Sequence, residues 1–154
     1  MLFEFDGLTG DVGGIIAEYS GLQDPGREIP YGATQAHGMT WDDLRGHSLN
    51  DAEVRAILAR ASLLVAHNAR FDRGFVAKLY PEVTRSEWRC SMDGIPWRTK
   101  GFRSKGLQEL LSDHGLRVDA VHRALDDARN TLRLLSQRQP DGRTYLADLF
   151  QLKR

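Results

Sequence analysis

The chain has 154 residues and a formal net charge of zero, because 21 Lys and Arg balance 21 Asp and Glu. Apolar residues make up 41% and charged residues 27%, which argues against a disordered chain and predicts one globular domain in water. The charge balance excludes a global basic surface, the single cysteine excludes an internal disulfide or a thiolate zinc cluster, and no apolar run is long enough to cross a membrane.

The start of the chain carries Glu4 and Asp6, where a signal peptide would need positive charge followed by an apolar stretch. A single cysteine also fits a reducing compartment. We therefore expect a cytoplasmic protein with no membrane partner.

The first third of the chain predicts a hairpin, a long connection and two helices. Leu2 to Phe5 and Ile15 to Tyr19 have strand character and are separated by glycines. Residues 22–38 contain Pro and Gly that break any period, so they form a connection. Thr40 begins a short helix with a capping box, and Asn50 begins a longer one.

The middle of the chain predicts a strand followed by a helix. Leu63 to Ala66 form a continuous apolar run, as in a strand buried on both faces of an α/β sheet. The next helix should begin near Asn68 and end before Pro81. Phe71 and Phe75 recur at helical spacing, and we expect these aromatic residues to anchor the helix.

The last part predicts a short strand and two helices. Trp88 to Met92 fit a strand, Leu107 begins a helix, and the longest helix spans residues 123–137. The alternation of strands and helices predicts an α/β fold. We expect one domain over residues 1–138 and a C-terminal tail, residues 139–154, that docks on it.

One candidate site is the segment His67-Asn68-Ala69-Arg70-Phe71-Asp72, at the junction of a strand and a helix. The carboxyl ends of strands are where α/β sheets bind ligands, and Asp72 would lie in the first turn of the helix. A structural alternative is that Asn68 only caps the helix and Asp72 only favours its positive end.

A second candidate site is the segment from His122 to Ala128, which begins the last helix. Asp127 lies five residues beyond His122, so the imidazole and the carboxylate can face one cleft. Ala124 and Ala128 are small and allow a close approach to the sheet. The structural alternative is an acidic first turn favoured by the helix dipole.

The two segments together resemble a known family. HNARFDRGF and the later HRALDDA are similar to the second and third motifs of the DnaQ-like, DEDDh exonucleases, which include the proofreading epsilon subunit of bacterial DNA polymerase. PYGATQAHGMTWDDL resembles a loop of the same family. The resemblance covers roughly residues 2–138 and implies a ribonuclease H-like mixed sheet flanked by helices.

The resemblance also implies roles for single residues. Asp72 and Asp127 would be catalytic metal ligands, and Asp126 their solvated neighbour. His122 would be the general base, a role that suits imidazole near neutral pH. The residues implied to bind substrate or to support that site are His37, Gly38, Met39, His67, Asn68 and Phe71.

The sequence departs from the family at its start. The family's first motif is Asp-x-Glu on the first strand, whereas this sequence begins with what resembles the second strand. Glu4 and Asp6 stand in reverse order beside the hairpin turn and are poor substitutes. We expect a fold that lacks the first strand. Three explanations are open: the start of the gene was placed too late, the chain was trimmed, or the protein is a true inactive relative.

The implied function is metal-dependent 3′-5′ exonuclease activity on DNA or RNA, with Mg²⁺ or Mn²⁺ in a two-metal site that is incomplete here. The implied partner is a nucleic acid with a free 3′ end, and a DNA polymerase or a second copy of the chain could also bind. The main alternative is an inactive nucleic-acid- or nucleotide-binding pseudo-exonuclease. A mononuclear metal hydrolase using His67 and His122 is less favoured, because no close His pair supports it.

Overall fold

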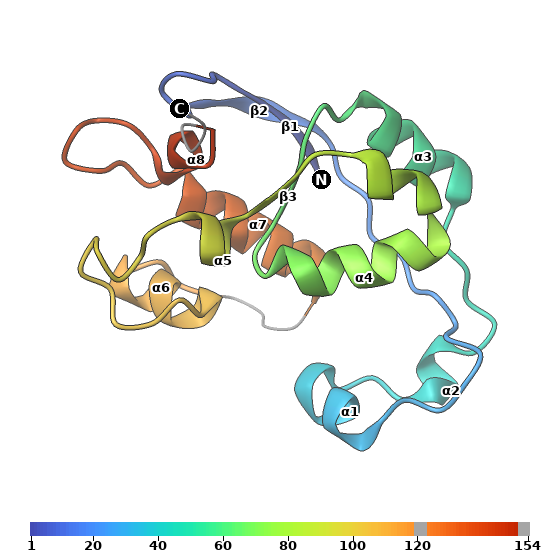
Figure 1. The fold of residues 1–154 in the computed structure, drawn as a ribbon. Helices are drawn as coiled ribbons and strands as arrows, with labels where there is room; N and C mark the ends of the chain where they lie inside the picture. Colours follow the sequence, from blue (N-terminus) through green and yellow to red (C-terminus); the bar gives the residue numbers. More distant parts are fainter. Residues whose placement is uncertain (119–122, 151–154) are drawn as a thin grey trace.

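The protein is described here by a computed structural model that covers residues 1–118 and 123–150 (Figure 1). Strands and helices alternate, which confirms the α/β class. The strands are β1 (Leu2–Phe5), β2 (Val12–Ala17), β3 (Leu64–Ala66) and β4 (Trp88–Cys90). The helices are α1 (Tyr31–His37), α2 (Trp41–Leu44), α3 (Asp51–Arg60), α4 (Ala69–Leu79), α5 (Ser91–Gly94), α6 (Leu107–Asp113), α7 (Ala124–Leu135) and α8 (Tyr145–Asp148), with a 3-10 helix, η1, at Pro81–Arg85.

The predicted hairpin is confirmed, with a shifted second strand. β1 and β2 are antiparallel, and Phe5 pairs with Val12. The second strand begins at Val12 and not at Ile15, because Asp6 closes a tight turn directly after β1. Its carboxylate accepts the Thr9 N–H at 2.8 Å, and its own N–H donates to the Asp11 carbonyl at 2.8 Å.

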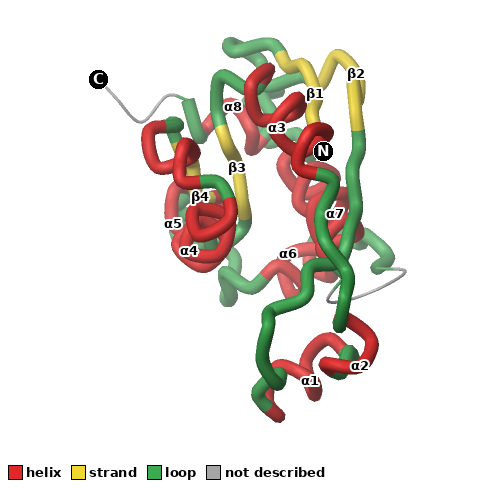
Figure 2. The backbone as a smooth tube through the Cα atoms, turned by 90° about the vertical axis from the view of Figure 1, so that its right-hand side faces the viewer, coloured by secondary structure: helices red, strands yellow, loops and turns green. Residues whose placement is uncertain are grey.

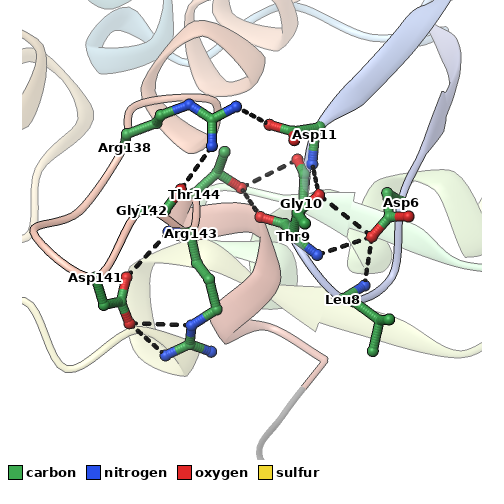
Figure 3. A network of polar contacts seen from close by, with 10 residues as sticks. All are labelled: Asp6, Leu8, Thr9, Gly10, Asp11, Arg138, Asp141, Gly142, Arg143 and Thr144. Atoms are coloured by element: carbon green, nitrogen blue, oxygen red, sulfur yellow. Dashed lines mark hydrogen bonds and ion pairs between the residues drawn. The ribbon is translucent and has the colours of Figure 1, made fainter.

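This turn is held against the segment that follows α7 (Figure 3). The Thr144 hydroxyl donates to the Gly10 carbonyl at 3.0 Å, and Arg138 pairs with Asp11. Gly10 has φ +76°, and a Cβ built on it would lie 2.1 Å from Thr144 Oγ1. Only glycine fits this close approach without displacement.

The strands form two separate pairs among the described residues, and not the one mixed sheet that the resemblance implies. β3 and β4 are parallel, with Leu64 opposite Trp88 and Ala66 opposite Cys90. No ladder joins β1 to β3 in this part of the chain, and Figure 2 shows the two pairs apart. β3 is consequently half-buried, and the expectation of burial on both faces is wrong.

The core is formed by helices and not by the sheets. Phe5 of β1 and Val65 of β3 both pack against it, so the two strand pairs share one support. Within the described ranges, no helix is long and apolar enough to cross a membrane. The buried core residues come from α6, α7, α8 with the residue after it, and the loop after α5: Ile95, Trp97, Leu110, Leu111, Leu134, Leu135, Tyr145, Leu146 and Leu149.

The helix α4 is present where the sequence predicts it, but its aromatic residues do not anchor it. Ala69 is buried at its start, whereas Phe71 and Phe75 are exposed. Periodicity identifies the apolar side of a helix but not what covers that side. The expectation that the two phenylalanines hold α4 in place is therefore wrong.

Candidate functional site

Asp72 lies in the first turn of α4, one turn after the end of β3. The chain turns at Asn68, whose backbone is left-handed with φ +66°, a conformation that Asn adopts more readily than most residues. The Asn68 carbonyl accepts the Phe71 N–H at 2.9 Å, while its side chain makes no cap bond in the described structure. The junction thus presents a half-buried carboxylate at the start of the helix.

Asp127 lies in the first turn of α7, where its N–H donates to the Arg123 carbonyl at 2.8 Å. The neighbouring Asp126 is 3.6 Å from Arg129. Arg129 also binds Glu18 through two hydrogen bonds of 2.9 and 2.7 Å. This bidentate pair fixes the first turns of α7 against the end of the β1–β2 hairpin.

Asp127 is near enough to Asp72 for its charge to act on the Asp72 carboxyl. Burial raises the pKa of the Asp72 carboxyl, and the negative charge of Asp127 raises it further. The two carboxylates repel each other when both are ionised, so a proton or a cation beside them is stabilising. The pair is therefore suited to hold a positive charge.

The two carboxylates are the right kind of ligand for a hard cation, but they are too few to hold it alone. Carboxylate oxygens are the ligands that Mg²⁺ and Mn²⁺ prefer. Within residues 1–118 and 123–150, however, no group of three or more His, Cys, Asp or Glu side chains could hold a metal ion. His122, the general base implied by the resemblance, lies outside the described residues.

Both ring nitrogens of His67 are engaged inside the protein. Nδ1 lies 2.9 Å from Ser91 Oγ, and Nε2 lies 2.8 Å from the Lys105 carbonyl oxygen. Because Nε2 faces a carbonyl, it must carry the proton and donate it. Burial is the main cause that lowers the pKa of His67, which favours this neutral form. The resemblance implies a supporting role for His67, but the sequence does not predict its partners, since Ser91 and Lys105 are far away along the chain.

The remaining residues implied to bind substrate lie on a separate arm. His37 ends α1, Gly38 follows with φ +72°, and the Met39 N–H donates to His37 Nδ1 at 3.1 Å. In both views the α1–α2 segment projects from the body and lies apart from α4 (Figures 1 and 2). The structure thus does not bring these three residues against Asp72.

The Asp6 carboxylate stabilises the turn after β1 by accepting backbone hydrogen bonds. The backbone N–H groups of Thr9 and Leu8 lower the pKa of its carboxyl. Its turn contacts the chain after the C-terminal end of α7, whereas Asp127 lies at the opposite end of that helix. Eight residues, about 12 Å along the helix, separate Asp127 from Leu135 at the C-terminal end of α7.

An open groove lies on another side of α4, between this helix and β4. Its volume is about 540 Å³, and neither Asp72 nor Asp127 lines it. Arg70 and Gly74 line it from the helix, and Cys90 from the strand. No sequence motif indicates this groove, because it depends on how α4 crosses β4.

Comparisons with known proteins agree on one family. The chain matches RNase_T, described as Exonuclease, over residues 4–135. It is 32% identical over 144 residues to the DNA polymerase III subunit epsilon of Treponema pallidum, which covers 88% of this chain and 66% of that protein. It is 31% identical over 150 residues to the PolC-type DNA polymerase III of Thermotoga maritima, covering 92% of this chain and 11% of that protein.

A third relative is the PolC-type DNA polymerase III of Clostridium perfringens, with 30% identity over 128 residues, 80% of this chain and 9% of that protein. The chain therefore spans about a tenth of the length of these PolC-type relatives. No solved structure matches the chain.

Proposed function

Because this chain belongs to the RNase_T exonuclease family, we propose that its site hydrolyses phosphodiester bonds from the 3′ end of a nucleic acid with a divalent cation bound. The observation that supports the proposal is the effect of the Asp127 charge, from α7, on the half-buried Asp72 carboxyl of α4. A carboxylate whose pKa is raised by burial and by the charge of a second carboxylate is typical of a cation site of this chemistry.

In this proposal the residues have separate tasks. Asp72 and Asp127 hold the cation, and His122 accepts a proton from the attacking water. When bound, Mg²⁺ or Mn²⁺ supplies an activated water and stabilises the charge on the leaving oxygen. His67 keeps the β3–α4 junction in place, and Asn68 turns the chain so that Asp72 can reach the cation.

We propose a ribonuclease H-like arrangement of the strands as the complete form of this fold. The two strand pairs rest on one helical core, which supports the proposal. A strand placed between β1 and β3 would join them into one mixed sheet. The same strand could bring the Asp-x-Glu carboxylates that none of the described strands carries.

The proposed substrate is DNA, since the relatives are named as DNA polymerase III proteins. The proposed protein partner, on the same ground, is a DNA polymerase. For His37, Gly38 and Met39 to contact the terminal nucleotide, the nucleic acid has to reach from α4 to the arm that carries α1.

A second candidate function is binding without turnover. It is favoured by one observation: the described residues contain no group of three or more His, Cys, Asp or Glu that could hold a metal ion, whereas a two-metal site needs ligands for both ions. Such a protein would keep affinity for nucleic acid and lose hydrolysis.

The decisive experiment measures hydrolysis of a 3′-labelled oligonucleotide in Mn²⁺. We expect little or no activity from the 154-residue chain and recovery when a strand bearing Asp-x-Glu is fused before Met1. In that extended protein, Asp127→Ala should abolish turnover, His122→Ala should lower it by roughly 10²- to 10⁴-fold, and Asp126→Ala is the matched control.

Two outcomes would decide against this proposal. If the 154-residue chain is active and keeps that activity in Asp127→Ala, then Asp127 is not part of the catalytic site and the proposal is wrong. An extended protein that binds the oligonucleotide but never cleaves it would favour binding without turnover.

A further inference from the structure

The helix side of the groove between α4 and β4 consists mainly of small residues. Ala69, Gly74 and Ala77 line it from the helix, and Trp88 lines it from the strand. A Cβ built on Gly74 would meet nothing within 4 Å, so the space beside this residue is open. The volume of about 540 Å³ lies in the range of ligand-binding pockets.

The groove lies beside a free edge of the β3–β4 pair. The Leu64 N–H donates to the Glu87 carbonyl at 2.9 Å, so this carbonyl points toward β3. Because the N–H and C=O groups of successive residues in a strand point to opposite sides, those of Trp88 point away from β3. In the described part of the chain, no strand pairs with that side of β4. Trp88 therefore offers a donor and an acceptor to an additional strand.

The charge of the groove favours an anionic occupant. Arg70 lines it with an exposed side chain and makes no ion pair within residues 1–118 and 123–150. Arg73 also lines it and donates to the Thr84 carbonyl at 2.9 Å, a contact that does not neutralise the guanidinium. None of the lining residues is Asp or Glu. Two cations without an acid between them attract a negatively charged partner.

The free edge favours a peptide over a nucleic acid as this partner. Phosphates could pair with Arg70 and Arg73, but the sugar-phosphate backbone of DNA offers only acceptors. The Trp88 carbonyl needs a donor, which the N–H groups of a peptide supply. The Trp88 side chain is half-buried, and its indole N–H donates to the Val83 carbonyl at 3.0 Å. It thus forms a wall of the groove and not an open platform for bases.

We propose that the groove between α4 and β4 binds an extended acidic segment of a partner protein, which adds a strand to β4. Every second side chain of the segment enters the groove against Gly74 and Ala77. Carboxylates of the segment pair with Arg70 and Arg73. The inference goes beyond the proposed function, because neither Asp72 nor Asp127 lines the groove.

The test uses a fluorescein-labelled peptide of alternating valine and glutamate, about eight residues long, which is enough for one strand. Fluorescence anisotropy compares it with a peptide that has lysine in place of glutamate. We expect saturable binding of the glutamate peptide and no binding of the lysine peptide. Amide exchange followed by NMR should show protection of the Trp88 N–H in the saturated complex, because the added strand accepts it.

Two variants test the place of binding. Gly74→Leu fills the groove in a position that is open in the free protein, so it should weaken binding of the glutamate peptide by roughly 5- to 150-fold through overpacking. Lys78→Leu is the matched control, because it adds the same side chain to α4 outside the groove, and it should keep the affinity.

A charge reversal tests the selection of an acidic segment. Arg70→Glu should weaken binding of the glutamate peptide by roughly 2- to 5-fold, the range for an exposed ion pair, and should strengthen binding of the lysine peptide. A gain of affinity for the second peptide cannot result from loss of folding.

Four outcomes would overturn the proposal. The first is a glutamate peptide that does not bind, and the second is an affinity for it that Gly74→Leu leaves unchanged. The third is a Trp88 N–H that stays unprotected in the saturated complex. The fourth is binding of single-stranded oligothymidylate that competes with the peptide better than the peptide binds and is lost in Gly74→Leu, which would assign the groove to a nucleic acid.

Discussion

Asp72 in α4 and Asp127 in α7 are electrostatically coupled across two helices: burial raises the pKa of Asp72, and the charge of Asp127 raises it further. The coupling exists only in the folded chain, since the two residues are distant in sequence. An ionised, partly buried carboxylate next to a second one destabilises the fold. Sites that bind cations commonly carry such a cost, because the same repulsion is relieved on binding.

Asp127→Asn should lower the pKa of Asp72 toward its ordinary value. The substitution removes a negative charge and keeps the shape of the side chain, while the effect of burial on Asp72 remains. Titration of the Asp72 carboxyl carbon by NMR measures the change. Asp126→Asn is the control, because that carboxylate is paired with Arg129. This variant should leave the pKa of Asp72 unchanged. An unchanged titration in Asp127→Asn would show that the two residues are not coupled.

Asp72→Asn should stabilise the protein at neutral pH. The folded-state pKa of Asp72 lies above its ordinary value of 3.8, so the folded state binds the proton more tightly. Stability therefore falls as pH rises from that value through the folded pKa, and the variant avoids this loss. Urea unfolding should show a stabilised variant at pH 7 and no difference at pH 3. A variant that is less stable at pH 7 would contradict this sign.

The isolated chain should bind divalent cations weakly, with Mn²⁺ at least as well bound as Mg²⁺. Two carboxylates leave most of an octahedral shell to water, and Mg²⁺ sheds water reluctantly. Titration calorimetry with each cation tests this, and Asp127→Ala should remove the binding. A site for Mg²⁺ of micromolar affinity or tighter would show that further ligands complete the cluster.

The elements of this fold were largely predictable because their signals are local. Thr40 begins the short helix α2, and its N–H donates to the Asp43 carboxylate at 2.7 Å. The Asn50 side chain accepts the Glu53 N–H at the start of α3, as the spacing predicts. Start signals of this kind depend on residues a few positions apart, which a sequence displays directly.

What the sequence could not predict depends on distant segments. The spacing of Phe71 and Phe75 predicts an apolar side of a helix, but exposure depends on whether another segment covers it. The bonds of His67 to Ser91 and Lys105 join three parts of the chain without a motif. For the candidate site, Asp72 and Asp127 are predicted from their positions at helix starts and from the family resemblance, whereas the separation of the strand pairs was not predicted.

His67→Gln should reduce the loss of stability on mild acidification. Burial, the largest cause, lowers the folded-state pKa of His67 below its ordinary value of 6.5. The unfolded chain therefore binds the proton more tightly, and stability falls as pH drops below about 6.5. Urea unfolding between pH 5 and 7.5 should give a shallower slope for the variant, which can still donate to the Lys105 carbonyl. His47→Gln, at an exposed histidine, should keep the slope of the original protein.

Gly10→Ala should destabilise the fold more than the same change at another left-handed glycine. Gly10 has φ +76°, and a Cβ there would lie 2.1 Å from Thr144 Oγ1 and 2.6 Å from the Ala147 backbone N. Backbone strain and overpacking together should cost roughly 2–4 kcal/mol. Gly26 has φ +65° with nothing within 4 Å of a built Cβ, so Gly26→Ala should cost only the strain, about 1–2 kcal/mol. Urea denaturation of the two variants compares these losses. Equal losses would show that the β1–β2 turn is not closely packed against the segment between α7 and α8. The polar contacts of Thr144 with this turn would then not hold the hairpin in place.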